Sequence, residues 1–279
     1  MNFASDNAYT AHPAVMAALA DANSGAMMGY GADPVTARAE AAMRELLEAP
    51  EAVVRFVATG TAANALVCAQ LSPGYGRIYC HEDAHIETSE CAAPEFFSSG
   101  AKLITVPGAD GKMTPDALSG AIRRGAGGGL NEGRNAMVSI TNATEWGTLY
   151  TAAEVASLAD AAHAGGLPLH LDGARFANAV AGLGCSAADL TWRAGVDALC
   201  FGGTKNGAMA AEAVVFFNPA HAEGFDYRRK QTGQVHSKQR YLAAQMLALA
   251  SDGLWLELAA AANAKAARLA DGILAAGGT

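Results

Sequence analysis

Lys205 is the residue whose surroundings in this sequence favour the most reactive chemistry. The segment 198–201 is typical of a short buried strand, and Gly202 and Gly203 end it. Lys205 therefore follows a strand end, between glycines that permit a close approach of the backbone. An amine desolvated in such a place can be neutral enough to form a Schiff base with a carbonyl compound. The alternative is an ordinary solvated lysine, because lysine is rarely buried.

A possible anion-binding turn follows another predicted strand. A β-rich stretch ends at Ala58, and a helix is predicted to begin directly after Gly60 and Thr61. The free N–H groups and the dipole at a helix N-terminus attract anions, and the hydroxyl of Thr61 adds a donor. The same pattern also occurs as a plain helix cap, so phosphate binding is one of two interpretations.

Asp172 ends an otherwise apolar strand in the segment 169–175. A buried carboxylate is costly unless it meets a cation, and a protonated pyridine nitrogen would be one. In that position Asp172 would keep the ring an electron sink. Arg175 could bind a substrate carboxylate through two hydrogen bonds. The alternatives are an ion pair between Asp172 and Arg175, or Asp172 as the cap of the following helix.

Two histidines, His81 and His85, follow the strand predicted at 77–80. His85 could lie over a planar ring or act as an acid or base, whereas His81 could simply lie at the surface. Their i, i+4 spacing also fits two zinc ligands. The sequence nominates no third ligand, however, so we expect no metal.

These candidates fit together as one set. An anion-binding turn, a histidine to cover a ring, a carboxylate and a lysine follow one another along the chain, each at a predicted strand end. Pyridoxal 5'-phosphate (PLP) requires these parts, so the sequence predicts PLP as the cofactor.

Alternating helices and strands are expected to position this set. The expected strands are 52–58, 77–80, 102–106, 136–141, 168–172, 198–201 and 213–217, and the expected helices are 12–22, 34–47, 61–71, 114–123, 151–164 and a pair within 238–276. Short apolar strands separated by helices indicate an α/β fold with a mostly parallel sheet covered on both faces. Ligands of such folds bind beyond the carboxyl ends of the strands, which is where the candidate residues fall.

The composition narrows the class of protein. A chain of 279 residues with 51% hydrophobic residues can form one large domain, or a large and a small one. The net charge of −8 argues against a nucleic-acid partner. No signal peptide and no apolar run of membrane-spanning length is evident, so we expect no membrane partner and a cytoplasmic protein. Five scattered cysteines fit free thiols in a reducing compartment.

Seven motifs resemble those of the L-threonine aldolase family, which belongs to the β-eliminating lyase group of fold-type I PLP enzymes. They are Phe3-Ala-Ser-Asp-Asn7, Tyr30-Gly-Ala-Asp-Pro34, Thr59-Gly-Thr-Ala-Ala-Asn64, Asp83-Ala-His-Ile-Glu87, Thr144-Glu-Trp-Gly-Thr148, His170-Leu-Asp-Gly-Ala-Arg175 and Phe201-Gly-Gly-Thr-Lys-Asn-Gly207. They span nearly the whole chain. The sequence is most similar to the low-specificity bacterial branch of the family, which handles phenylserine-type substrates as well as threonine.

The resemblance implies a role for each matching residue. Lys205 becomes the Schiff-base lysine, Asp172 the partner of the pyridine nitrogen, and His85 the ring-stacking histidine and candidate base. The other cofactor contacts that it implies are Gly60, Thr61, Arg175, Thr204 and Lys230, and the substrate contacts are Ser5, Tyr30 and Arg175. Tyr30 and Lys230 would serve a neighbouring subunit, so we expect a homodimer or homotetramer with shared active sites.

The sequence departs from the family pattern in two places. Some members carry a second active-site histidine where this chain has Asn131-Glu-Gly-Arg134, so His85 or a bound water must do more. The family also has a small C-terminal subdomain with another carboxylate-binding arginine, and this sequence ends before it. We therefore expect either a longer natural chain or compromised activity. The expected division is an N-terminal helix and active-site loop over 1–30, a large PLP-binding α/β domain over 31–237, and the helical start of the C-terminal subdomain over 238–279.

The reaction implied by the resemblance is that of a carbon–carbon lyase. L-Threonine, L-allo-threonine and related β-hydroxy-α-amino acids would be cleaved to glycine and an aldehyde. The alternatives are another fold-type I reaction, such as β-elimination or racemisation, and a non-catalytic PLP-binding homologue.

Overall fold

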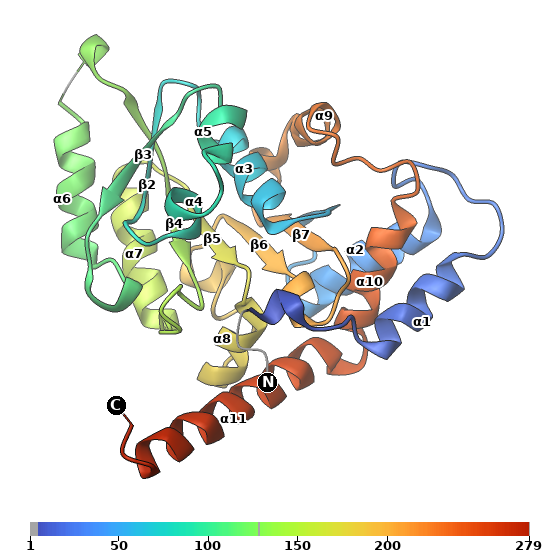
Figure 1. The fold of residues 1–279 in the computed structure, drawn as a ribbon. Helices are drawn as coiled ribbons and strands as arrows, with labels where there is room; N and C mark the ends of the chain where they lie inside the picture. Colours follow the sequence, from blue (N-terminus) through green and yellow to red (C-terminus); the bar gives the residue numbers. More distant parts are fainter. Residues whose placement is uncertain (1–4, 128, 279) are drawn as a thin grey trace.

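The structure is a computed structural model that describes residues 5–127 and 129–278, in which a sheet lies between two layers of helices (Figure 1). The seven strands are β1 (Val53–Val57), β2 (Gly76–His81), β3 (Lys102–Val106), β4 (Arg134–Thr141), β5 (Leu169–Gly173), β6 (Ala198–Gly202) and β7 (Glu212–Phe216). All seven correspond to strands expected from the sequence, with ends that differ by at most two residues.

The sheet has the strand order β1-β7-β6-β5-β4-β2-β3. Strand β7 is antiparallel to both of its neighbours, and the other pairings are parallel. The prediction of a mostly parallel sheet is therefore confirmed. Because β7 runs the opposite way, its first residue, Glu212, lies level with Val57 and Gly202, the last residues of β1 and β6. Glu212 thus joins the edge at which the parallel strands end.

Helices cover both faces of the sheet because most strands are apolar on both sides. The α-helices are α1 (Pro13–Ala22), α2 (Pro34–Leu46), α3 (Gly60–Leu71), α4 (His85–Thr88), α5 (Ala93–Phe97), α6 (Pro115–Gly125), α7 (Ala152–Ala164), α8 (Phe176–Leu183), α9 (Phe225–Gln231), α10 (Arg240–Ala250) and α11 (Leu254–Ala275). Alternate residues of β6 enter different cores: Ala198 and Cys200 face the α3 side, while Leu199 and Phe201 face the opposite side.

Local capping explains where several expected helices begin. Thr59, Thr114 and Thr151 each accept a hydrogen bond from a backbone N–H of the first helical turn, which satisfies a donor that has no partner within the helix. The sequence predicted no residue ranges for the short helices α4, α5, α8 and α9. Their four to eight residues are too few to show a clear helical period.

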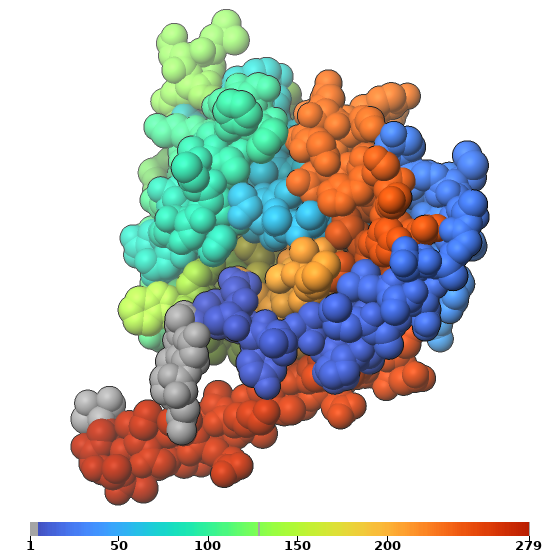
Figure 2. Space-filling view, turned by 45° about the vertical axis from the view of Figure 1, so that its right-hand side comes forward, coloured from blue at the N-terminus to red at the C-terminus, as the bar shows by residue number. Residues whose placement is uncertain are grey.

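The pair of helices expected within 238–276 is present as α10 and α11, with a break at Ser251–Gly253. Helix α10 packs against α1 and α2, and α11 packs against α8. Beyond the contact with α8, α11 extends away from the sheet layers (Figures 1 and 2). In the part of the chain that the structure describes, no helix combines the length and apolar character that a bilayer crossing requires.

Candidate active site

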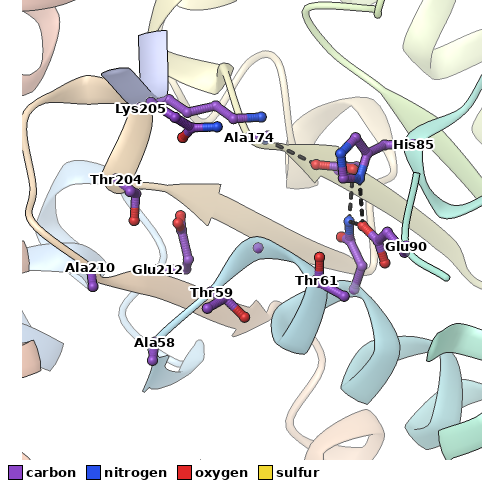
Figure 3. A pocket seen from close by; sticks show the side chains of 14 residues that line it. Ala58, Thr59, Thr61, His85, Glu90, Ala174, Thr204, Lys205, Ala210 and Glu212 are labelled. Atoms are coloured by element: carbon purple, nitrogen blue, oxygen red, sulfur yellow. Dashed lines mark hydrogen bonds and ion pairs between the residues drawn. The ribbon is translucent and has the colours of Figure 1, made fainter. Parts of the chain in front are cut away.

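A cavity of about 290 Å³ lies at the carboxyl edge of the sheet, where the fold predicts a ligand site (Figure 3). Residues from five segments that are far apart in the sequence line it: Asn7, Ala58, Thr59, Gly60, Thr61, Asn64, His85, Glu90, Asp172, Ala174, Thr204, Lys205, Ala210 and Glu212. The structure therefore brings together Lys205, Asp172, His85, Gly60, Thr61 and Thr204 of the residues expected from the sequence.

Lys205 reaches the cavity because the end of β6 is tightly packed. A Cβ atom on Gly202 would lie 2.2 Å from the carbonyl oxygen of Ala174, so only glycine allows β6 to pass this close to the end of β5. A single 3₁₀ turn, Thr204–Asn206, then carries the half-buried Lys205, and Gly207 leaves that turn with a φ of 101°. In Figure 3 the Lys205 side chain extends across the cavity towards His85 and Glu90.

Asp172 is a buried carboxylate with defined partners. Its side chain is 3% exposed, and its two oxygens accept hydrogen bonds from the Asn64 amide at 2.8 Å and the Ala174 N–H at 3.0 Å. The alternative of an ion pair with Arg175 does not form. The alternative of Asp172 as a helix cap is wrong as well, because Arg175 is the cap residue of α8 and no side chain bonds to the first turn of that helix. The bond from Ala174 stabilises the turn after β5, and the carboxylate also lines the cavity.

The N-terminus of α3 forms the opposite wall of the cavity. Thr59 caps the helix by accepting from the Ala62 N–H at 3.1 Å, so the hydroxyl of Thr61 is not the cap. Gly60 and Thr61 are the first two helical residues, and their N–H groups have no partner within the helix. With Thr204 on the same cavity, this wall offers backbone and hydroxyl donors to an anion.

A hydrogen-bonded chain links His85 to Asp172 through two residues that the sequence analysis did not single out, Glu90 and Asn64. His85 Nδ1 lies 2.8 Å from Glu90 Oε1. The Asn64 amide donates to that same oxygen and to Asp172, at 2.8 Å each. Asn64 stands within a motif that had been noted, whereas nothing in the local sequence marks Glu90.

Burial and pairing set the protonation of this chain. The hydrogen bond to Glu90 raises the pKa of His85, although burial acts in the opposite direction. Burial raises the pKa of Glu90, and its hydrogen bonds with His85 and Asn64 lower it in part. The Oε1 atom of Glu90 accepts two hydrogen bonds, which favours an ionised Glu90 paired with His85.

Arg175, which we expected to bind the carboxylate of a substrate, binds the carboxylate of Asp6 in this structure. Its Nε and Nη2 donate to the two oxygens of Asp6 at 2.7 and 3.0 Å. Burial raises the pKa of Asp6, but Arg175 and the charge of Lys205 lower it more. Ser5 is exposed and donates to Asp6 at 3.2 Å, while Asn7 lines the cavity. Neither Ser5 nor Arg175 lines it, and residues 3 and 4 of the matching motif lie outside the described residues.

Tyr30 and Lys230 do not line this chain's cavity either. They meet each other elsewhere: Lys230 Nζ lies 4.3 Å from the centre of the Tyr30 ring, and that ring is 58% exposed. This placement leaves both side chains accessible on the surface of one subunit.

His81 does not occupy the surface position considered for it. His81 is buried rather than at the surface, because its ring bonds the Gly108 carbonyl at 3.1 Å and accepts from the Asp83 N–H. Within residues 5–127 and 129–278 no cluster of three His, Cys, Asp or Glu side chains is arranged to hold a metal ion. The segment 131–134 lies at the start of β4, at the sheet edge opposite the cavity.

The residues of the cavity fit PLP. A buried carboxylate suits a protonated ring nitrogen, the first turn of α3 with Thr204 suits a phosphate, and Lys205 supplies an amine on the same cavity. The Asn64 Oδ1 atom is also buried without a hydrogen-bond partner. The cavity volume is close to the lower end of the range typical of small-molecule sites.

The seven-stranded sheet and its helices form the fold of fold-type I PLP-dependent enzymes. Residues 2–279 match the family model of the beta-eliminating lyases. Two proteins described as low specificity L-threonine aldolases are each 47% identical to the chain. The one from Pseudomonas sp. (strain NCIMB 10558) is matched over 94% of this chain and 75% of that protein, and the one from Pseudomonas aeruginosa over 96% and 77%.

A solved structure supports the same relationship. The threonine aldolase of Leishmania major superimposes with a TM-score of 0.92 at 32% identity, over 98% of this chain and 79% of that chain. The chain therefore belongs to the beta-eliminating lyase family, as the sequence motifs predicted. Membership of this family implies dependence on PLP.

Proposed function

We propose that this protein is a PLP-dependent, low-specificity L-threonine aldolase that cleaves β-hydroxy-α-amino acids to glycine and an aldehyde. The observation that carries the proposal is the cavity in which Lys205, the buried Asp172 and the first turn of α3 face one another. The 47% identity to the two Pseudomonas enzymes favours aldol cleavage over β-elimination or racemisation.

In this proposal five of the residues that line the cavity bind the cofactor. Lys205 supplies the amine that holds the cofactor covalently, Asp172 faces the ring nitrogen, and Gly60, Thr61 and Thr204 hold the phosphate. When bound, PLP supplies an electron-withdrawing ring that accepts the charge left on the substrate's α-carbon. Arg175 does not line the cavity, so to bind the substrate carboxylate with its two-pronged geometry it must first release Asp6.

His85 is the proposed base for the β-hydroxyl group. Its Nδ1–H donates to Glu90, which leaves Nε2 to take the hydroxyl proton. Loss of that proton allows the Cα–Cβ bond to break and the aldehyde to leave, and a proton delivered to Cα then completes glycine. Substrate atoms are conserved in the two products, so the reaction needs no oxidant and no net water.

A product assay separates the candidate reactions. The purified protein with PLP is incubated with L-threonine, L-allo-threonine or phenylserine. We expect glycine in equal amounts with acetaldehyde from the threonines and with benzaldehyde from phenylserine. Ammonia and 2-oxobutyrate would instead indicate β-elimination, and a coloured protein without product would indicate a non-catalytic PLP binder.

We also propose that the active form is a homo-oligomer in which Tyr30 and Lys230 complete a neighbouring subunit's site. Both side chains are exposed and neither lines this chain's cavity, which supports this assignment. Mixing inactive Lys205→Ala subunits with inactive Lys230→Ala subunits should restore part of the activity, because some sites then receive both intact residues. Absence of any restoration in verified mixed oligomers would argue against shared sites.

A cytoplasmic location remains our proposal for the protein. All five cysteines are free thiols in the structure, which suits a reducing compartment. Fractionation of the source cells should place the aldolase activity with cytoplasmic markers, and recovery with periplasmic or membrane markers would contradict it.

A further inference from the structure

Glu212 is a buried acid on the cavity wall to which neither the sequence motifs nor the proposed mechanism gives a role. It is the first residue of β7 and is 6% exposed. Its Oε2 accepts a hydrogen bond from the Gly203 N–H at 2.8 Å, directly beside the turn that carries Lys205. In Figure 3 its carboxyl group points into the space between Thr204 and Thr61.

The position of Glu212 creates an electrostatic conflict. The cavity that it lines also contains Gly60, Thr61 and Thr204, the donors proposed for the phosphate. An ionised carboxylate and a phosphate anion repel each other strongly at a site shielded from water. A neutral carboxylic acid removes that repulsion and adds an O–H donor.

The surroundings of Glu212 keep a large fraction of its carboxyl group neutral up to about pH 7. Burial raises its pKa to about 7, although the Thr204 hydroxyl, the Gly203 N–H and the charge of Lys205 all lower it. The other titratable groups on the cavity are His85, Glu90 and Asp172. Among the elements packed against β7, β6 and α3 bring the buried thiols Cys200 and Cys68, and β1 brings Arg55, which is paired with Glu40 and Asp226.

We propose that Glu212 is a cofactor-positioning residue that acts as a neutral carboxylic acid beside the phosphate. It holds the Gly203–Lys205 turn through one oxygen, and its ionisation at higher pH weakens binding of the phosphorylated cofactor. The inference rests on the proposed function and adds a pH-dependent control of cofactor affinity. It also explains how a fully buried acid can share a cavity with an anion.

The test compares wild type with Glu212→Gln, both stripped of cofactor. At each pH between about 6 and 9, the dissociation constant of PLP is measured from the change in visible absorbance as PLP is added. Glutamine keeps the shape and a donor but cannot ionise. The ratio of the wild-type constant to the variant constant should rise by at least about tenfold over this range, because only the wild type gains the repelling charge. Ionisation of PLP and of Lys205 affects both proteins and cancels in the ratio.

Pyridoxal, which lacks the phosphate, is the matched control ligand, and its ratio should stay constant with pH. A constant ratio for PLP as well would overturn the role of Glu212 while leaving the proposed function intact. A wild type that develops no absorbance change with PLP at any pH would overturn both proposals.

A second measurement needs no variant and so does not depend on whether Glu212→Gln folds. Near pH 8 the wild type should take up more protons on binding PLP than on binding pyridoxal, by a sizeable fraction of one, because Glu212 must be reprotonated beside the phosphate. Calorimetry in buffers of different ionisation enthalpy gives this number. Equal uptake for the two ligands would contradict the proposal.

Discussion

The chain of contacts from His85 through Glu90 and Asn64 to Asp172 governs the chemistry at the scale of single residues. One amide, that of Asn64, bonds two buried carboxylates whose positions in the sequence are 26 and 108 residues away. Sequence motifs indicated Lys205, Asp172 and His85 because each lies at the end of a predicted strand or shortly after one. They did not indicate Glu90, because its role depends on contacts that only the folded chain creates.

If His85 is the base, its removal should slow the chemical step without unfolding the protein. His85→Ala is expected to lower kcat by about 10²- to 10⁴-fold, the usual contribution of a positioned acid or base. Steady-state kinetics with L-threonine measures the loss, and circular dichroism checks the fold. An unchanged kcat would assign the proton transfer to another group or to water.

Glu90→Gln should shift the pH dependence of cleavage. The Glu90 charge raises the pKa of His85, so its loss lets His85 shed its proton at lower pH. The acid limb of kcat/KM should then move down by about one pH unit, and the maximum rate should fall because the base is weaker.

Glu87→Gln is the matched control, because Glu87 lies on α4, the helix that carries His85, but is exposed. We expect it to leave the acid limb in place. Equal profiles for Glu90→Gln and the wild type would remove Glu90 from the control of His85.

At the scale of the elements, the site depends on how closely the ends of β5 and β6 approach. The sequence predicted both strands, and it predicted that β6 ends at Gly202 and Gly203. Hydrophobic periodicity and glycine content are local signals, so neither prediction needs the folded structure. It did not predict which backbone the glycine meets. That contact, between Gly202 and Ala174, depends on the parallel pairing of strands that are almost thirty positions apart.

Gly202→Ala should therefore destabilise the fold. Its Cβ would stand 2.2 Å from a backbone oxygen that has no rotamer to change, which is an overpacking cost of about 1–3 kcal/mol in the free energy of unfolding. Urea denaturation measures this loss. Gly272→Ala is the control: it lies within α11 with open space around it and should stabilise by about 0.5–1 kcal/mol. Similar effects from both variants would contradict the close contact at Gly202.

For the whole molecule, the mixed sheet places seven strands so that residues from five distant segments meet at one edge. The alternation of helices and strands was sufficient to predict a sheet covered on both faces. The antiparallel direction of β7 was not predictable from that alternation, because periodicity carries no information about strand direction. This direction is what brings Glu212 to the cavity.

A buried histidine on β5 should make global stability sensitive to acid. His170 is fully buried between Ser139 and Cys200, and burial lowers its pKa to about 4. Below about pH 6.5 His170 binds a proton in the unfolded chain but stays neutral in the folded chain. The free energy of unfolding therefore falls as the pH falls towards 4. The full loss is about 3 kcal/mol.

His170→Asn supplies the comparison for this prediction. Other groups, including Glu90 and Glu212, titrate in both proteins and cancel in the difference. The stability advantage of wild type over His170→Asn, measured by urea denaturation, should shrink by about 2–3 kcal/mol between pH 7 and about pH 4.5. Parallel pH profiles would show that His170 is not held neutral.

The most direct test of the account is to locate the covalent bond between protein and cofactor. The protein is loaded with PLP, reduced with borohydride to fix any carbon–nitrogen double bond, digested and analysed by mass spectrometry. We expect one pyridoxyl group per chain, on Lys205, which Lys205→Ala abolishes and Lys265→Ala on the exposed surface of α11 leaves in place. A label on Lys230 or another lysine, or no label at all, would contradict the central claim.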